Sequence, residues 1–576
     1  MKRIARIFFG AMVAAGIVRA GDDEFQSYKV DKSIRLPTAP PAAREAWKDD
    51  RFGLFVHWGP ISQIGKQLSH SRNSPSHRPG GKPYKSAPIP PEVYDAQYKT
   101  FNPTNFDPDA IVEMAKAAGA RYLVFTAKHH AGFSMFVSDY TDYDMASTPY
   151  KRDIVKQFAD ACAKGGIHFG FYYSPRDWHH PDCDSQEHHD RYIRFYENQM
   201  HELLTKYGPI REVWFDGLGP GGPKGWGNTS AEVMAMIRKY QPDAMVNDRG
   251  GAGADFYTPE HYVGFYNADE CWEACHTTTG QWGYNPQVHA KKLPQLMEIL
   301  LYCWGGDGNV LLNIGPRGDG SVNPEEKERF EQLAAWWKTR GEQSIRKTRG
   351  GPYLPGPWGV STRKDDRVFL HVFRWPESGR LFFPTLDGAK PKAARLLASG
   401  KPVALKKGAK GFFIAVPPSD REPIVTTIEI RFDAPVTELA ARYRAPSLLA
   451  DADLSASTAA DTLDALRDRD ASTSWSVKFP KGAKELWVEA KFPRPVTIGA
   501  FAVQRGDRNW TPKFDVELQV PDGSGGWKTV SDPKTRIRFE PMKFLPEPVE
   551  SDRVRLLVSG TRKFGCAEFE LFPPVE

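Results

Sequence analysis

Asp216 ends an apolar run and is the first residue of this chain that calls for a chemical explanation. Residues 212–215 have the composition of a buried strand, and the run stops abruptly at Asp216 and Gly217. In a β/α barrel, a carboxylate at this position lies where the strand ends converge on the substrate pocket. Such a carboxylate can attack an electrophilic carbon if a second carboxyl group handles the proton, as in glycosidases.

Polar or aromatic groups lie at the ends of this and the other predicted strands. They are His57, His129 and His130, Tyr173, Trp214 and Arg249, with Glu260 and Glu273 close behind as candidates for the second carboxyl group. At a single strand end such a group could be accidental, but at several ends these groups indicate a shared pocket. Each residue taken singly could instead have a purely structural role; His57, for example, could be a hydrogen-bonded core histidine.

A metal-dependent mechanism is not expected. His129 and His130 are adjacent, and neighbours in extended backbone point to opposite faces, so they rarely share an ion. The histidine pairs at 179–180 and 188–189 stand in a loop rich in Asp and Pro, where solvent exposure is the default. The sequence predicts no catalytic metal and no organic cofactor.

The composition describes a globular chain of several domains. Its 576 residues are 40% hydrophobic and 26% charged, and 77 basic and 71 acidic residues give a formal charge of +6. The two signs are mixed along the chain without a basic stripe, so no nucleic-acid partner is expected. The 16 Trp, 21 Tyr and 34 Phe residues suit sugar stacking and equally suit a large core.

The region from 50 to 345 repeats one unit: a capped amphipathic helix, a glycine or turn, and a short strand. Helices are predicted at 107–118, 153–164, 190–206, 231–240 and 293–304, and strands at 53–56, 122–126, 167–173, 213–215, 244–246 and 310–313. Parallel strands need crossover helices of this kind. No Gly-x-Gly-x-x-Gly turn follows the first strand, so a TIM-like (β/α) barrel over residues 21–345 fits better than an open sheet.

The N-terminus has the pattern of an export signal. Three basic residues precede the apolar run 7–18, and a small-residue cleavage site is predicted before Gly21. No other apolar stretch approaches the length of a membrane span. A signal peptide over residues 1–20 therefore predicts a periplasmic or secreted protein. The six cysteines are too sparse for a disulfide framework; Cys271 and Cys275 could pair, and two buried free thiols are an equal alternative.

Beyond Gly350 the helical period vanishes and all-β structure is predicted. Strands at 368–373, 411–416 and 425–432 indicate a small β-sandwich over residues 350–444, followed by a linker at 445–455. A last β domain is predicted over residues 450–576. Its candidate strands are 486–492, 498–504, 514–519, 537–545, 553–558 and 567–571.

Segments in order between residues 45 and 345 resemble the α-L-fucosidases of glycoside hydrolase family 29. They are His57-Trp58-Gly59 and residues 128–133, 153–155, 172–174, 214–217, 247–249, 258–260, 282–284 and 311–316. The C-terminal domain is similar to a discoidin-like (coagulation-factor type C, galactose-binding-like) β-jelly-roll, through the run Asp470 to Trp475. Such modules bind glycans or a calcium ion, so a structural calcium is a candidate there, and a purely structural role is an equal alternative.

The fucosidase resemblance implies a double displacement that retains the anomeric configuration. Asp216 would be the nucleophile, and a second carboxyl group would protonate the leaving oxygen and later activate water. The sugar-binding residues that the resemblance implies are His57, His129, His130, Tyr173, Trp214, Arg249 and, against the C5 methyl of fucose, Trp282.

The acid/base is the open assignment. Glu260, in Thr-Pro-Glu, matches the position used by some family members, and Glu273, in Trp-Glu-Ala-Cys, matches the position used by others. The spacing from Arg249 favours Glu260. The chain also departs from the family after the first strand, where Gln67 stands in a segment that commonly carries a glutamate and a tryptophan. Gln67 can exchange hydrogen bonds with a sugar but holds no charge.

The sequence therefore predicts an exported, retaining exo-α-L-fucosidase acting on fucosylated oligosaccharides, glycoproteins or polysaccharides. One alternative is an α-L-galactosidase-like hydrolase on the same fold, because L-galactose shares the stereochemistry of fucose. The other is a non-catalytic glycan-binding protein with a disabled barrel, and Asp216 with two candidate acids counts against it.

Overall fold

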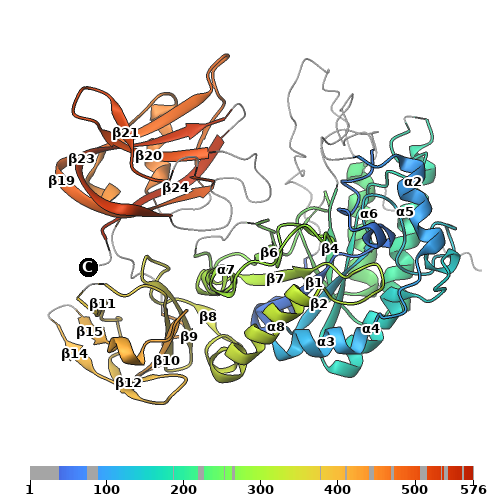
Figure 1. Cartoon of the computed structure of the whole chain (residues 1–576), viewed down its shortest axis with the longest axis horizontal. Coiled ribbons are helices and arrows are strands. Elements are labelled where there is room, and N and C mark those ends of the chain that lie inside the picture. The colour runs from blue at the N-terminus through green and yellow to red at the C-terminus, as the bar shows by residue number, and fades with distance from the viewer. Residues whose placement is uncertain are drawn as a thin grey trace, which may run out of the picture.

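Three regions with separate hydrophobic cores make up the computed structural model (Figure 1). The residues that the structure describes are 38–73, 88–185, 187–217, 226–251, 253–261, 266–376, 378–408, 411–439, 447–468, 473–505, 515–532, 535–536, 543–560 and 564–574. The predicted signal peptide 1–20 lies outside the described residues, as do positions 470–472 of the run that suggested a discoidin-like domain and positions 537–542 of a candidate strand.

The first region is built on a parallel sheet in the order β5-β4-β3-β2-β1-β7-β6. Its strands are β1 Phe52–Val56, β2 Tyr122–Lys128, β3 His168–Tyr173, β4 Ile210–Phe215, β5 Met245–Val246, β6 Glu273–Thr277 and β7 Asn309–Ile314. Nearly every strand residue is buried, as expected for strands covered on both faces. The predicted parallel β/α architecture is confirmed, but as a (β/α) half-barrel: β5 and β6 are the two edges of the sheet and do not pair, so the predicted TIM-like closure is not observed. β6 is a strand that the repeat pattern did not reveal.

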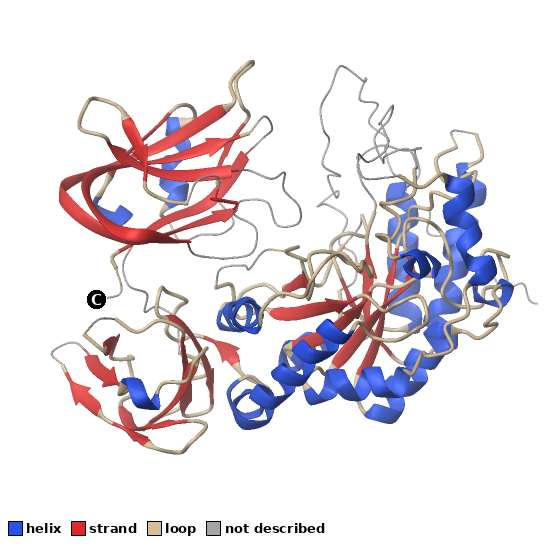
Figure 2. Ribbon diagram, in the orientation of Figure 1, coloured by secondary structure: helices blue, strands red, loops and turns tan. Residues whose placement is uncertain are grey.

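Helices cover the outside of this sheet (Figure 2). They are α1 Pro41–Asp50, α2 Pro91–Asp95, α3 Pro108–Ala117, α4 Ile154–Gly165, α5 His189–Lys206, α6 Trp226–Tyr240, α7 Leu293–Gly305, α8 Pro324–Trp336 and α9 Glu342–Ser344. The cap predicted at Ser230 for helix 231–240 is wrong, because α6 begins at Trp226 and includes Ser230. The cap predicted at Asp107 is confirmed: its carboxylate accepts from Ala110 N at 3.0 Å, and in the same way the Asp153 carboxylate accepts from Lys156 N at 2.8 Å. Each cap satisfies a backbone N–H that the first helical turn leaves unpaired.

An irregular extended segment lies between the two edge strands, β5 and β6. Isolated parallel bridges join Asn247 to Phe256, Tyr257 to Trp272 and Glu260 to Cys275. This segment, residues 247–260, follows β5 where the repeat pattern would place a crossover helix. It therefore brings a loop, with its polar side chains, to the carboxyl end of the sheet.

The second region is a β-sandwich core between a six-stranded sheet, β13-β12-β16-β10-β9-β8, and a three-stranded sheet, β11-β15-β14. The strands are β8 Arg349–Gly350, β9 Gly359–Lys364, β10 Arg367–Val372, β11 Arg380–Pro384, β12 Pro391–Leu396, β13 Pro402–Val403, β14 Leu405–Lys407, β15 Gly411–Ala415 and β16 Thr426–Phe432. Neighbouring strands are antiparallel, and the strands predicted at 368–373, 411–416 and 425–432 are present within one residue at either end.

The third region is an antiparallel sheet in the order β18-β24-β19-β23-β20-β21, with β17 and β22 paired to its side. Its strands are β17 Asp453–Ala456, β18 Trp475–Val477, β19 Glu485–Arg505, β20 Asp515–Pro521, β21 Trp527–Thr529, β22 Thr535–Arg536, β23 Lys543–Ser559 and β24 Phe564–Phe572. Leu449 is buried in the core of this region and β17 pairs with β19, so part of the predicted linker 445–455 belongs to the third region.

A buried ion pair between Arg51 and Asp307 links the beginnings of β1 and β7 in the parallel sheet, and it also contacts the second region. Arg51, directly before β1, is fully buried and donates to Asp307 Oδ1 at 3.2 Å and to the Trp304 carbonyl at 2.6 Å. Asp307 also accepts a hydrogen bond from Gly350 N, in β8, at 2.7 Å. The carboxylate therefore compensates a guanidinium that has no access to water.

We expect Asp307→Ala to destabilise the protein by roughly 3–5 kcal/mol, because the substitution leaves the Arg51 charge buried and uncompensated. Thermal and urea unfolding of the purified variant measure this loss. Asp160→Ala is the matched control, since Asp160 pairs with Lys156 on an exposed helix face and such pairs contribute little. Equal stabilities of the two variants would contradict the role of Asp307.

Candidate active site

Asp216 directly follows β4 and contacts side chains from neighbouring strand ends. Its Oδ2 accepts a hydrogen bond from the Tyr172 hydroxyl at 3.1 Å and lies 3.7 Å from His130 Nε2, and its Oδ1 lies 3.3 Å from Arg249 Nη1. The Asp216 side chain is 29% exposed, so a ligand can reach it. Gly217 has φ +88°, and a Cβ there would stand 2.7 Å from the His130 ring, so only glycine fits beside the carboxylate.

The surroundings keep Asp216 ionised. Burial by itself would raise the pKa of this carboxyl group, but the charge of Arg249 and the hydrogen bonds from Tyr172 and Arg249 outweigh burial. The net effect is a pKa below the ordinary aspartate value. Asp216 is therefore in the form that attacks carbon.

Arg249 brings a second carboxylate to the same place. Its Nη1 donates to Glu260 Oε2 at 2.9 Å while it contacts Asp216 Oδ1 at 3.3 Å. Because one nitrogen contacts both oxygens, these oxygens are at most about 6 Å apart. Retaining glycosidases hold their carboxyl groups about 5–5.5 Å apart, whereas inverting ones need about 6.5–9.5 Å for a water molecule.

Trp214 and Tyr172 form the floor beneath these charges. The Arg249 guanidinium lies over the Trp214 ring, 4.8 Å from its centroid, and the rings of Trp214 and Tyr172 stack at 6.2 Å and 19°. Cation–π attraction of this kind orients a guanidinium that is shielded from water. Trp214 thus lies at the site, as predicted.

Tyr172 occupies the position that the sequence predicted for Tyr173. The Tyr173 hydroxyl donates to Gln199 at 2.8 Å and its ring packs on Tyr196 at 5.5 Å, so it points to helix α5 and away from Asp216. The predicted role of Tyr173 is wrong. Successive residues of a strand point to opposite faces, and the prediction selected the wrong face of β3.

Each of three predicted histidines is fixed through Nδ1. His57 Nδ1 lies 2.7 Å from Asn313 Oδ1, His129 Nδ1 lies 2.6 Å from Ser69 Oγ, and His130 Nδ1 lies 2.7 Å from Ser174 Oγ. The His129 ring stacks on Tyr172 at 5.3 Å. A partner at one ring nitrogen orients the ring and its other nitrogen.

Burial makes two of these histidines neutral. It lowers the pKa of His57 to about 3, and it lowers the pKa of His129 well below the ordinary value, with further lowering from the neighbouring histidines. A neutral imidazole has one N–H donor and one acceptor. The cluster is therefore equipped to exchange hydrogen bonds with hydroxyl groups rather than to supply charge.

Aromatic rings close another side of the site. The half-buried Trp282 lies 4.8 Å from the His57 ring and 4.8 Å from the His261 ring. Its carbonyl accepts from Asn313 Nδ2 at 2.7 Å, and the next residue, Gly283, donates its N–H to Gln67 Oε1 at 3.3 Å. Gln67 thus holds the backbone of the Trp282 loop.

His70 is a site residue that sequence reasoning missed. Its ring lies 5.6 Å from His130, 5.9 Å from His129 and 6.0 Å from Trp178. Burial lowers its pKa, although the nearby carboxylates Asp216 and Glu260 oppose this effect. The sequence signal that could have indicated His70 is its place three residues after Gln67, in the segment that departs from the family pattern.

Glu273 lies in a different environment from Glu260. It is the first residue of β6, and it is fully buried. Its carboxylate accepts from Trp214 Nε1 at 3.0 Å and from the Tyr122 hydroxyl, and it interacts with the carboxyl group of Glu212. Glu212 in turn accepts from Trp47 Nε1 at 2.9 Å. The structure brings Glu260, and not Glu273, into contact with Arg249.

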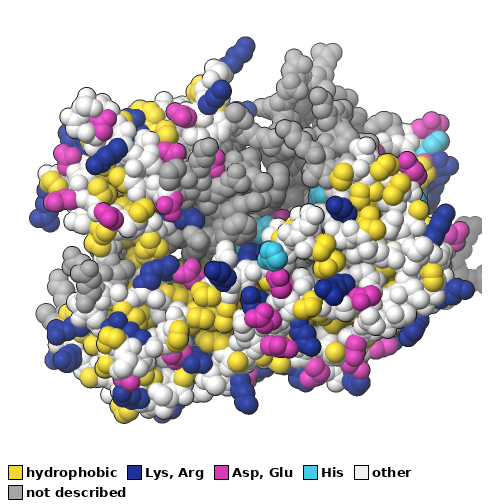
Figure 3. All heavy atoms as spheres, in the orientation of Figure 1, with side chains coloured by type: hydrophobic (Ala, Val, Ile, Leu, Met, Phe, Trp, Pro, Cys, Tyr) yellow, Lys and Arg dark blue, Asp and Glu magenta, His cyan; other side chains and the backbone are white. Residues whose placement is uncertain are grey.

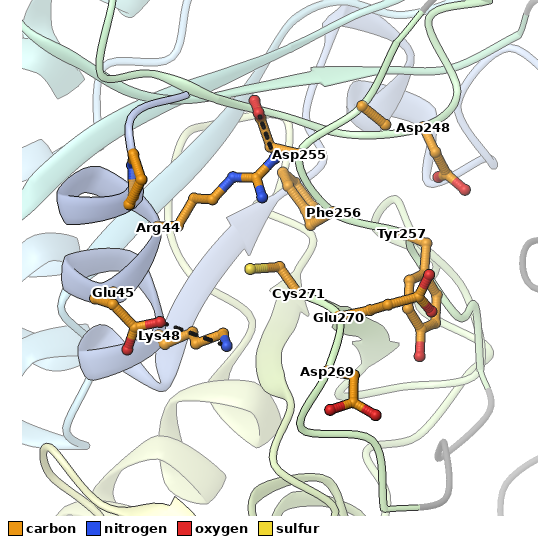
Figure 4. Close-up of a pocket in the computed structure, with 12 residues that line it drawn as sticks. Arg44, Glu45, Lys48, Asp248, Asp255, Phe256, Tyr257, Asp269, Glu270 and Cys271 are labelled. Carbon is orange, nitrogen blue, oxygen red and sulfur yellow. Dashed lines mark ion pairs between the residues drawn. The ribbon is translucent and has the colours of Figure 1, made fainter. Parts of the chain in front are cut away.

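A pocket of about 520 Å³ lies between α1 and residues 254–257 and 269–271 (Figure 4). Asp248 lines this pocket, whereas its neighbour Arg249 contacts Asp216. Within the described ranges, no group of three or more His, Cys, Asp or Glu side chains is arranged to hold a metal ion. All six cysteines, including Cys271 and Cys275, are buried free thiols.

The surface and the helices add two further findings. Figure 3 shows basic and acidic side chains interspersed on the face in view. None of the helices in the described part of the chain combines the length and the apolar character that a membrane span requires.

Comparison with known proteins gives one consistent result. A sequence profile of the family described as alpha-L-fucosidase matches residues 27–342. Plasma alpha-L-fucosidase of Homo sapiens is 29% identical over 395 residues, which cover 62% of this chain and 82% of the human protein.

Solved structures extend the similarity. A GH29 alpha-L-fucosidase from Bacteroides thetaiotaomicron, a trapped covalent intermediate with 2-fluoro-fucosyl fluoride, aligns with a TM-score of 0.61 and 26% identity, covering 71% of this chain and 99% of its own. The alpha-L-fucosidase from Vibrio sp. strain EJY3 covers 93% of this chain and 97% of its own with a TM-score of 0.63. At 22% identity this likeness shows a common fold, and the 93% coverage shows that the fold extends beyond the half-barrel.

We expect the stability of the protein to fall as the pH rises above the ordinary glutamate pKa of 4.5, in part because of the Glu212–Glu273 pair. Burial raises the pKa of both groups, so the folded state keeps protons that the unfolded state has already released. Glu273→Gln, which is neutral at every pH, should flatten the dependence of the melting temperature on pH between about pH 5 and pH 8. An unchanged slope in this variant would refute the explanation.

Proposed function

The chain belongs to the α-L-fucosidase family, glycoside hydrolase family 29, and we propose that it hydrolyses terminal α-L-fucosides with retention, using Asp216 as nucleophile and Glu260 as acid/base. The observation that carries this proposal is the contact of one Arg249 nitrogen with both carboxylates. This contact keeps the two groups near the separation that retaining hydrolysis requires. The covalent intermediate trapped in the Bacteroides thetaiotaomicron relative is consistent with it.

In the first step, Asp216 Oδ attacks the anomeric carbon and forms a glycosyl ester. The bond from this carbon to the leaving oxygen breaks, and Glu260 gives its proton to that oxygen. Arg249 stabilises the ionised nucleophile before attack, and its guanidinium remains beside Glu260 as the proton leaves. The Tyr172 hydroxyl, 3.1 Å from Asp216 Oδ2, orients the carboxylate during attack.

In the second step, the Glu260 carboxylate removes a proton from water, and the water oxygen attacks the anomeric carbon. The ester bond to Asp216 breaks, fucose leaves with its original configuration, and both carboxyl groups return to their starting states. No external oxidant, metal or cofactor enters this balance.

The neutral histidines and the aromatic wall account for recognition of the sugar. His57 and His129 are neutral and supply donors and acceptors for adjacent hydroxyl groups without a net charge, and a sugar is itself neutral. His130, held by Ser174, adds a hydrogen-bonding ring beside Asp216. The Trp282 ring beside His57 offers an apolar face for the C5 methyl group. Gln67 contributes through the Trp282 loop, whose backbone it holds.

The choice of Glu260 over Glu273 is supported by their surroundings. Glu260 contacts Arg249, and its side chain is 19% exposed, so a leaving group and water can reach it. Glu273 is fully buried at the beginning of β6 and has Tyr122 and Trp214 as hydrogen-bond partners. We propose that Glu273 is structural and holds the Trp214 ring beneath Arg249.

The remaining expectations extend this proposal beyond the site. The substrates are fucosylated oligosaccharides, glycoproteins or polysaccharides, and the N-terminal pattern of residues 1–20 supports export to the periplasm or the medium. We further propose that the third region is a discoidin-like jelly roll, supported by its antiparallel sheet and core. Calcium is its candidate structural ligand.

We expect Asp216→Ala to lower kcat on an aryl α-L-fucoside by at least about 10³-fold, because it removes the carboxylate that forms the glycosyl ester. Steady-state release of the aryl alcohol measures this effect. Asp139→Ala, which removes an exposed carboxylate paired with Lys206, should retain wild-type kcat. The proposed function would be refuted if the wild-type protein did not cleave the fucoside. It would also be refuted if Asp216→Ala kept wild-type activity.

We expect Glu260→Ala to lower kcat by about 10²–10⁴-fold on substrates with poor leaving groups, since these need general acid catalysis. Azide should restore turnover of an activated aryl fucoside and give α-fucosyl azide, because azide attacks the glycosyl ester without needing a base. Product analysis by NMR identifies the azide and its anomeric configuration. Glu273→Ala should show no rescue, and the reverse pattern would assign the acid/base to Glu273.

A further inference from the structure

We propose that Thr258 is a positioning residue, which holds Arg249 so that a single guanidinium nitrogen serves both catalytic carboxylates. The inference rests on the proposed function, because it takes Asp216 and Glu260 as the reacting pair. Thr258 touches neither carboxylate in any contact of the described structure, so it acts through Arg249 alone.

Thr258 occupies one complete edge of the Arg249 guanidinium. Its Oγ1 accepts from Arg249 Nε at 2.9 Å, and its carbonyl oxygen accepts from Arg249 Nη2 at 3.1 Å. Two donors on one edge of a planar group fix both its position and its rotation. The remaining nitrogen, Nη1, is thereby directed at Asp216 and Glu260.

Asp248 fixes the direction of the Thr258 hydroxyl. The hydroxyl donates to Asp248 Oδ1 at 3.1 Å, and an ionised carboxylate can only accept. The lone pairs of Oγ1 are therefore available to Arg249 Nε, and the two hydrogen bonds run in one direction, from Arg249 to Thr258 to Asp248. Thr258 is fully buried, so water cannot substitute for its hydroxyl.

The same arrangement keeps a competing carboxylate away from Arg249. Asp248 is near enough to raise the pKa of Arg249 together with Asp216 and Glu260. Without the Thr258 hydroxyl between them, a direct ion pair between Asp248 and Arg249 becomes available, and its formation rotates Nη1 away from the catalytic pair. Asp216 would then lose the charge that keeps it ionised.

Thr258→Val tests this inference, because valine has the shape of threonine and lacks only the hydroxyl group. On an aryl α-L-fucoside we expect kcat/KM to fall by about 10- to 100-fold, corresponding to the loss of a hydrogen bond to a charged group. The acidic limb of the pH profile of kcat/KM should move to higher pH, because the pKa of Asp216 rises when Arg249 moves away. Thr258→Ser keeps the hydroxyl and should restore both quantities to within about 3-fold of wild type.

Thr362→Val is the matched control for the loss of a buried threonine hydroxyl. Thr362 is fully buried in β9 of the second region, and its hydroxyl donates to the Ser344 carbonyl at 2.5 Å. This variant should lower the melting temperature and leave the pH profile unchanged. A Thr258→Val variant that is destabilised like the control, with a wild-type acidic limb, would show that Thr258 is only structural.

Substitutions of Asp248 test the chain of hydrogen bonds from Arg249 to Thr258 to Asp248 at its last member. Asp248 is half-buried and lines the pocket in Figure 4. Asp248→Asn keeps an acceptor oxygen for the Thr258 hydroxyl and should leave the acidic limb in place, whereas Asp248→Leu removes the acceptor and should move it to higher pH. Identical profiles for both variants would overturn the inference even if Thr258→Val does not fold. A wild-type enzyme inactive on the fucoside would instead refute the proposed function, so the two failures are distinguishable.

Discussion

The desolvated guanidinium of Arg249 is the constraint on which the rest of the site depends. A charge shielded from water needs partners on every side, and Arg249 finds them in Asp216, Glu260, Thr258 and the Trp214 ring. Two carboxylates as close as these would otherwise repel each other. The arginine between them makes the pair compatible, and it keeps the nucleophile ionised.

The place of Arg249 follows from an irregularity in the repeating fold. Between β5 and β6 the chain forms the extended segment 247–260 in place of a crossover helix. Asp255 N and Phe256 N donate to the Val246 carbonyl in β5, and a bridge from Glu260 to Cys275 joins the segment to β6. Loops at the carboxyl end of a parallel sheet carry function because the strands beneath them are rigid. Here one such segment supplies Arg249, the threonine that orients it, and the carboxylate of Glu260.

Beneath the site, burial separates the carboxyl groups by their chemistry. The cation Arg249 lowers the pKa of Asp216. The pKa values of Glu212 and Glu273 are raised, because no cation lies close enough to this pair to offset burial. The buried pair holds Trp47 and Trp214 by hydrogen bonds, so it supports the aromatic floor on which Arg249 lies. Asp216 and the Glu212–Glu273 pair thus differ in charge because their surroundings differ.

Local pattern alone predicted the parallel β/α region and most strand positions, and it placed Asp216, His57, His129 and His130 at strand ends, because strand period and strand ends are properties of neighbouring residues. It could not choose between Tyr172 and Tyr173, since an error of one residue inverts the face of a strand. Nor could it find β6, or connect His70 and Thr258 to the site. Those depend on which distant segments meet around one buried charge, and only the tertiary structure decides that.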